Sequence, residues 1–258
     1  MKYRKVTDTE RRQIQLDMLK EIDQFCRTHQ IRYSLSNGTL LGSIRHGGYI
    51  PWDDDVDICM PLPDVLRFRD LFKSNTMKYC DIDNERHYEF AFPRIVYTPT
   101  FSLRGQNVKS YGISIDLYPV LGMPNTEREV NIFFDEIREK LKWRLRMLTM
   151  NRRAQKFLMI KAIPGFDISV RRFRDKVYSF PYEGSHYLFH YGGDIKWSKV
   201  FEEDLFENLT ELTFEGEKFM AFSKYDDYLR HVYGDYMQIP PIEKRQAYHG
   251  TNNIYWKQ

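Results

Sequence analysis

Four aspartates are crowded into five positions, at Asp53, Asp54, Asp55 and Asp57. Carboxylates this close repel one another strongly unless something positive lies among them. Side chains alternate between the two faces of a strand, so Asp55 and Asp57 are expected on one face while Val56 enters the core. Such a pair predicts a site for Mg²⁺, or alternatively Mn²⁺, because Mg²⁺ is commonly held by one or two carboxylates with water and substrate phosphates. A solvated acidic turn is the alternative, but the interleaved apolar residues favour an ordered strand.

A third carboxylate, Asp116, stands in an apolar strand pattern with Ile115 and Leu117 on either side. A charge in a buried strand needs a partner, because burying it unpaired costs free energy. Asp116 on a neighbouring strand would complete a three-carboxylate site, of the kind that holds a metal and aligns a hydroxyl with a phosphate. Asp53 is expected to bind the metal directly or to orient the other ligands. A structural ion pair is the alternative for Asp116.

Gly38 and Thr39, just upstream of the acidic run, are typical of the turn from a strand into a helix. The free backbone N–H groups at a helix N-terminus can receive a phosphate. Arg45, at the end of the same predicted helix, can hold a phosphate bidentately or offset the nearby acids. The pattern therefore predicts a phosphate beside the metal.

The elements that must position these residues follow from the spacing of apolar side chains. Helical periodicity marks residues 8–29, 39–45, 63–73, 126–160 and 225–233, and strand patterns mark residues 31–35, 56–60, 79–104 and 112–120. Ser223 is the expected N-cap of the last helix and Gly234 its end. We therefore predict an α+β chain, with a catalytic half at residues 1–124 and a mostly helical C-terminal lobe at residues 125–258.

Composition excludes several classes of protein. With 42% apolar and 29% charged residues the chain is not a disordered one. No apolar stretch approaches the roughly 18 residues of a membrane span. Three scattered cysteines support neither a disulfide framework nor a zinc finger. The first residues lack the apolar core of a signal peptide, so a cytoplasmic location is expected.

The segment from Leu35 to Ile58 closely resembles the signature of the LicD family, which includes bacterial phosphocholine transferases and relatives of fukutin and fukutin-related protein. Further matches are Ser-Ile-Asp-Leu-Tyr-Pro at residues 114–119 and Tyr-Gly-Asp-Tyr-Met-Gln-Ile-Pro-Pro at residues 233–241, with His249 shortly after. The resemblance runs from about residue 10 to the C-terminus.

The resemblance implies a nucleotidyltransferase-type fold, with a short mixed β-sheet flanked by helices. It places the glycine motif at Gly38-Thr39, the paired metal aspartates at Asp55 and Asp57, and the third aspartate at Asp116. The implied reaction moves a phospho-alcohol, typically phosphocholine from CDP-choline, onto a sugar hydroxyl of a cell-surface glycan such as lipopolysaccharide or teichoic acid, and releases CMP.

Residue roles follow from this reaction as hypotheses. Asp55 and Asp57 would hold Mg²⁺ against the donor pyrophosphate, with Asp116 as a further ligand or as general base. Positive charge beside the phosphates is expected from Arg45 and Arg94. His249 in the tail is the candidate for capping the site, with a structural role as the alternative.

A strongly basic segment, residues 138–176, has 13 Lys and Arg against three acidic residues. In the predicted basic helix at residues 138–161, each such cation near anionic lipid contributes about 1 kcal/mol. Under the resemblance, this predicts peripheral contact with the inner membrane face, where lipid-linked glycan acceptors are assembled. A solvated helix face is the alternative. Nucleic-acid binding is a rival interpretation of the segment, but no recognised DNA or RNA motif accompanies it, so no nucleic-acid partner is expected. A nucleotidyltransferase that is attacked at the α-phosphate and releases pyrophosphate is the rival for the whole chain.

Overall fold

The computed structural model describes residues 3–85, 88, 90–104, 108–149, 173–192, 195–196, 199–202, 204–245 and 253–257. The predicted site residue His249 and most of the predicted basic segment lie outside these ranges. The chain divides into two compact units. The first comprises Met1–Tyr79, Arg94–Tyr118 and Leu205–Gln258, and the second comprises Cys80–Pro93 and Pro119–Asp204.

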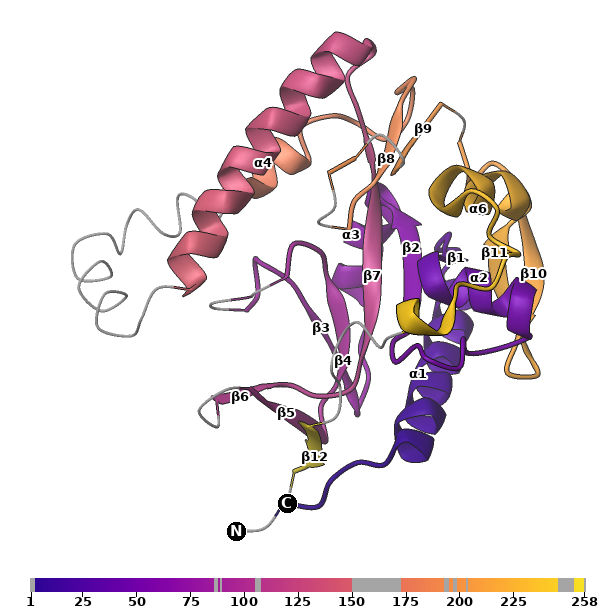
Figure 1. The fold of residues 1–258 in the computed structure, drawn as a ribbon. Helices are drawn as coiled ribbons and strands as arrows, with labels where there is room; N and C mark the ends of the chain where they lie inside the picture. The colour runs from indigo at the N-terminus through magenta and orange to yellow at the C-terminus, as the bar shows by residue number, and fades with distance from the viewer. Residues whose placement is uncertain are drawn as a thin grey trace, which may run out of the picture. The chain divides into compact units, whose positions relative to one another are not determined.

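A β-sheet runs through the first unit in the strand order β1-β2-β7-β4-β3 (Figure 1). Its strands are β1 (Ser34–Leu35), β2 (Asp57–Pro61), β7 (Ser114–Gly122), β4 (Arg94–Tyr97) and β3 (Met77–Cys80), the last residues of β3 and β7 belonging to the second unit. Pairing of β4 with β7 is antiparallel and sets Arg94 opposite Asp116. Every residue of β2 and β7 is buried, which explains their nearly continuous apolar sequences.

Among the described residues of the first unit, four α-helices accompany this sheet. They are α1 (Asp8–Thr28), α2 (Asn37–His46), α3 (Leu62–Leu71) and α6 (Tyr225–Tyr233). A capping box between Thr7 and Glu10 starts α1, and Gly47 in the left-handed conformation ends α2. The predicted α+β class is confirmed, and the ends of these four helices lie within two residues of the predicted ones.

Two small sheets complete the first unit. The hairpin of β10 (Leu209–Phe214) and β11 (Glu217–Phe222) turns at Glu215 and Gly216, both with positive φ. It is joined to the residues around β1, because the Phe222 amide donates to Ser34 Oγ at 3.0 Å. The other sheet has the order β12-β5-β6, with β12 (Ile254–Trp256), β5 (Thr100–Arg104) and β6 (Val108–Tyr111).

The second unit contains α4 (Glu127–Thr149) and the strands β8 (Leu188–His190) and β9 (Val200–Phe201). Antiparallel pairing places Val120, near the end of β7, opposite His190 of β8. Its core includes Phe134 and Phe189, whose ring centroids are 5.1 Å apart. The predicted helix at residues 126–160 is present from Glu127 to Thr149, and residues 150–160 lie outside the described ranges.

The expectation of a mostly helical C-terminal lobe is wrong. The described residues after 124 carry the five strands β8 to β12 besides α4, α6 and shorter helical turns. Phe214, Phe219 and Phe222 are buried along the β10–β11 hairpin, so tertiary packing stabilises strands there. Ser223 is not the N-cap of α6: Lys224 is, and its side chain makes no capping bond. Within the described part of the chain, no helix has the length and apolar character needed to cross a membrane.

Candidate active site

Three carboxylates from two neighbouring strands converge in the first unit. Asp55 lies two residues before the start of β2, Asp57 is the first residue of β2, and Asp116 lies in β7. One carboxylate oxygen from each lies within 4.8 Å of the others. The Asp116 amide donates to the Val56 carbonyl at 2.9 Å, so backbone bonding holds the strands in this register. The convergence expected from the sequence is present.

These carboxylates fit a hard divalent cation. Asp57 is 5% exposed and Asp116 1% exposed. Among the described residues, no hydrogen-bond partner is found for Asp57 Oδ1, which is buried. Burial and then the charges of Asp55, Asp116 and Asp53 raise the pKa of Asp57 well above its usual range. A buried, partnerless oxygen among crowded carboxylates is a donor set suited to Mg²⁺ or Mn²⁺.

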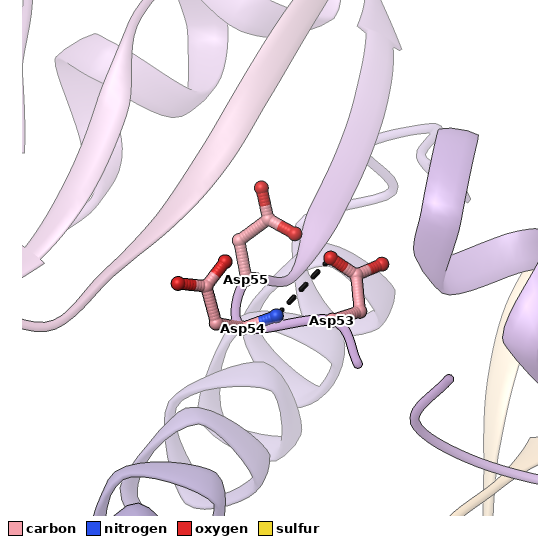
Figure 2. Close-up of side chains that lie close together, drawn as sticks. All are labelled: Asp53, Asp54 and Asp55. Atoms are coloured by element: carbon pink, nitrogen blue, oxygen red, sulfur yellow. Dashed lines mark hydrogen bonds between the residues drawn. The ribbon is translucent and has the colours of Figure 1, made fainter. Parts of the chain in front are cut away.

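A second group of carboxylates, from Asp53, Asp54 and Asp55, adjoins the first and shares Asp55 with it (Figure 2). Asp53 Oδ1 accepts from the Asp54 amide at 3.1 Å. Burial and then the neighbouring charge of Asp55 raise the pKa of Asp53 to about 7. The loop is held from α1, where the Arg11 guanidinium and Gln15 Nε2 donate to the Asp54 carbonyl. Helix α1 therefore fixes the turn that presents these side chains.

The start of α2 packs directly against the carboxylates. The Asp57 amide donates to Thr39 Oγ1 at 2.8 Å, and the Gly38 amide hydrogen-bonds the Asp57 carboxylate. A Cβ on Gly38 would lie 2.5 Å from Asp53 Oδ2, so only glycine fits there without displacing Asp53. The sequence placed Gly38 and Thr39 at a helix N-terminus correctly, and the binding of phosphate there stays a prediction.

The two predicted phosphate-binding arginines have different surroundings. Arg94 Nε donates to Asp116 Oδ1 at 2.5 Å, with side chains 12% and 2% exposed, so Arg94 is part of the carboxylate cluster. Arg45 Nη1 instead donates to the Tyr236 carbonyl at 2.7 Å. Burial lowers the pKa of Arg45. Arg45 thus connects the end of α2 to the segment that follows α6.

Two tyrosines beside the carboxylates were not identified from the sequence. Burial and then the charges of Asp57 and Asp116 raise the pKa of Tyr118. Tyr118 lies two residues beyond Asp116 on β7, so strand alternation was a usable signal for it. Tyr233, at the end of α6, is 43% exposed as a residue, but desolvation of its hydroxyl and then the charge of Asp57 raise its pKa. No local pattern indicates Tyr233, because it is distant in sequence.

Comparison with known proteins gives consistent matches. A family model described as the LicD/FKTN/FKRP nucleotidyltransferase domain matches residues 30–162, a range that includes all the carboxylates above. The chain is 28% identical over 268 residues to the lipopolysaccharide cholinephosphotransferase LicD of Haemophilus influenzae. This alignment covers 95% of this chain and 97% of that protein. It is also 57% identical over 89 residues to the ribitol 5-phosphate transferase FKRP of Homo sapiens. That alignment covers 34% of this chain and 17% of that protein.

Proposed function

Because the chain belongs to the LicD/FKTN/FKRP nucleotidyltransferase-domain family and is thus a transferase of substituted phosphate groups, we propose that it moves a phospho-alcohol from a CDP-alcohol donor to a sugar hydroxyl of a cell-surface glycan. Phosphocholine is our choice of group, because similarity to the cholinephosphotransferase covers 95% of the chain while similarity to human FKRP covers 34%. The observation that carries this proposal is the convergence of Asp55, Asp57 and Asp116.

In this proposal the carboxylates of Asp55, Asp57 and Asp116 hold a divalent cation, with Asp53 beside them. The cation supplies charge neutralisation for the donor phosphates and the leaving oxygen. Arg94 keeps Asp116 in place through their ion pair. Thr39 and Gly38 fix the backbone amide and the carboxylate of Asp57, so the ligands are oriented before the substrate binds.

The bond changes follow from the substrates. The acceptor hydroxyl oxygen forms a bond to the phosphorus that carries the alcohol, and the bond from that phosphorus to the CMP oxygen breaks. CMP leaves with the electron pair. Asp116 is our candidate for the base that takes the proton of the acceptor hydroxyl.

A second candidate function is nucleotidyl transfer, and it is favoured by the description of the matching family model as a nucleotidyltransferase domain. In that reaction the acceptor attacks the α-phosphate of a nucleoside triphosphate and pyrophosphate leaves. The products distinguish the two reactions: CMP marks phospho-alcohol transfer, and pyrophosphate marks nucleotidyl transfer.

The test is an assay of CMP and pyrophosphate with Mg²⁺, a panel of methyl hexosides as acceptors, and CDP-choline, CDP-ribitol, CDP-glycerol or CTP as donor. Wild-type protein should release CMP, fastest from CDP-choline. Asp55→Asn should lose this activity and keep the fold by circular dichroism, while Asp70→Asn, a matched change at an exposed side chain, should keep it. Absence of CMP from every CDP-alcohol with either Mg²⁺ or Mn²⁺, or wild-type turnover by Asp55→Asn, would refute the proposal.

A further inference from the structure

A cavity of about 560 Å³ opens in the first unit beside the carboxylates. It is lined by the first turns of α1 and by the loop of residues 49–54, with Glu215 from the hairpin turn. Its size lies within the roughly 300–1,000 Å³ of small-molecule sites in proteins. The charged side chains in its wall are Asp8, Arg11, Arg12, Asp53, Asp54 and Glu215.

The cavity adjoins the candidate active site at Asp53 and Asp54. Both line it, and a carboxylate oxygen of each lies within 4.8 Å of one on Asp55 (Figure 2). Asp55 in turn belongs to the group with Asp57 and Asp116. A ligand in the cavity therefore lies beside Asp53, which adjoins the carboxylates that would hold the metal.

The wall of the cavity is built in advance. Arg11 is 5% exposed and donates to the Asp54 carbonyl, while its buried Nε has no hydrogen-bond partner among the described residues. The Tyr49 amide donates to Glu215 Oε1 at 2.9 Å, and the Tyr49 hydroxyl donates to the Arg12 carbonyl at 3.2 Å. A preformed wall lowers the entropy cost of binding.

The charged residues that line the cavity determine which class of ligand it favours. Four acidic residues and two arginines line the cavity, so its excess of negative charge disfavours the phosphates of the donor. A quaternary ammonium ion prefers the free face of an aromatic ring. Here Arg12 already lies 4.9 Å from the centre of the Tyr49 ring, and Arg245 lies 5.1 Å from the centre of the Trp52 ring. An uncharged ligand with many hydroxyls matches the remaining mixture of donors, acceptors and ring edges.

We infer that this cavity is the subsite for the acceptor sugar, which enters from the α1 side and presents its hydroxyl next to Asp53. The inference rests on the proposed function, since it assumes a sugar acceptor. Gln13 offers a way to fill the cavity, because it lines it from an exposed position on α1. Gln24, also exposed on α1 but outside the lining, provides the matched control.

The experiment compares Gln13→Trp with Gln24→Trp in two measurements. Saturation-transfer NMR without donor or metal reports binding of the methyl glycosides of glucose, galactose and N-acetylglucosamine. Steady-state CMP release with Mg²⁺ reports KM for the same glycosides and for CDP-choline. We expect wild type and Gln24→Trp to bind a glycoside, and Gln13→Trp to lose the signal and to raise the glycoside KM by about tenfold or more, with an unchanged KM for CDP-choline.

The two measurements distinguish a wrong assignment of the cavity from a wrong proposed function. Equal glycoside binding by Gln13→Trp and wild type, or no binding by wild type while CMP release is normal, would overturn the assignment of the cavity. A rise of the CDP-choline KM alone would overturn it too, because the cavity would then belong to the donor. Absence of CMP release in the wild type overturns the proposed function instead, and the NMR result still decides whether the cavity binds sugar.

Discussion

Replacing Asp53 by Asn should stabilise the metal-free protein while impairing its activity. Asp53 is crowded by Asp55 and largely buried, and both effects disfavour its charged form. A pKa raised from 3.8 to about 7 corresponds to about 4 kcal/mol against ionisation in the folded state. An asparagine keeps the oxygen that accepts from the Asp54 amide and carries no charge. Because neighbouring groups readjust, we expect a gain of about 2 to 4 kcal/mol at pH 8.

The pH dependence has a definite sign. The folded protein holds the Asp53 proton up to a higher pH than the unfolded chain does, because the folded pKa is the higher one. Stability of the wild type is therefore lost as pH rises from about 4 to about 7. The advantage of Asp53→Asn should be only about 1 to 2 kcal/mol at pH 5 and reach its full size above pH 7.

Urea unfolding monitored by circular dichroism in EDTA, at pH 5 and pH 8, measures these differences. Glu21→Gln removes a charge from an exposed position of α1 and serves as the control, with little change expected. Added Mg²⁺ should stabilise the wild type more than Asp53→Asn, because the metal binds only the folded state. An Asp53→Asn protein that is no more stable than wild type at pH 8 in EDTA would show that burial and the charge of Asp55 do not disfavour the ionised form of Asp53 as described.

Three further substitutions test other contacts of the cluster. Arg94→Met should lower the free energy of unfolding by about 3 kcal/mol, because it leaves the buried Asp116 without its ion pair to Arg94. Urea unfolding in which this variant is as stable as wild type would contradict the pairing. Thr39→Val should cost about 1 to 3 kcal/mol by removing the acceptor of the Asp57 amide; Thr39→Ser should restore it, and equal denaturation midpoints for the two variants would argue against the bond. Asp57→Asn should abolish Mn²⁺ binding measured by electron paramagnetic resonance and raise the melting temperature in EDTA, whereas unaltered Mn²⁺ affinity would remove Asp57 from the ligand set.

The helices and the first two metal-site carboxylates were predictable from the sequence. Helices α1, α2, α3 and α6 follow from apolar spacing between residues three and four apart, which is a local property of the chain. Asp55 and Asp57 are two residues apart at the start of a strand, so the alternation of strand side chains was enough to predict that their oxygens lie together. The closeness of the Asp55 and Asp57 carboxylates could therefore be predicted without long-range information.

Other features of the site depend on contacts between residues far apart in the sequence. Asp116 meets Arg94 because β4 pairs with β7 in one register, and a shift of one residue would turn Asp116 to the other face. The C-terminal hairpin was mistaken for part of a helical lobe because short aromatic segments become strands or helices according to what they pack against. Local periodicity depends only on residues close together in the sequence, whereas strand register and burial arise only when the folded chain brings distant residues into contact. That is why the carboxylates could be read from the sequence, while the partners of Arg45, the position of Tyr233 and the cavity beside Asp53 required the tertiary structure.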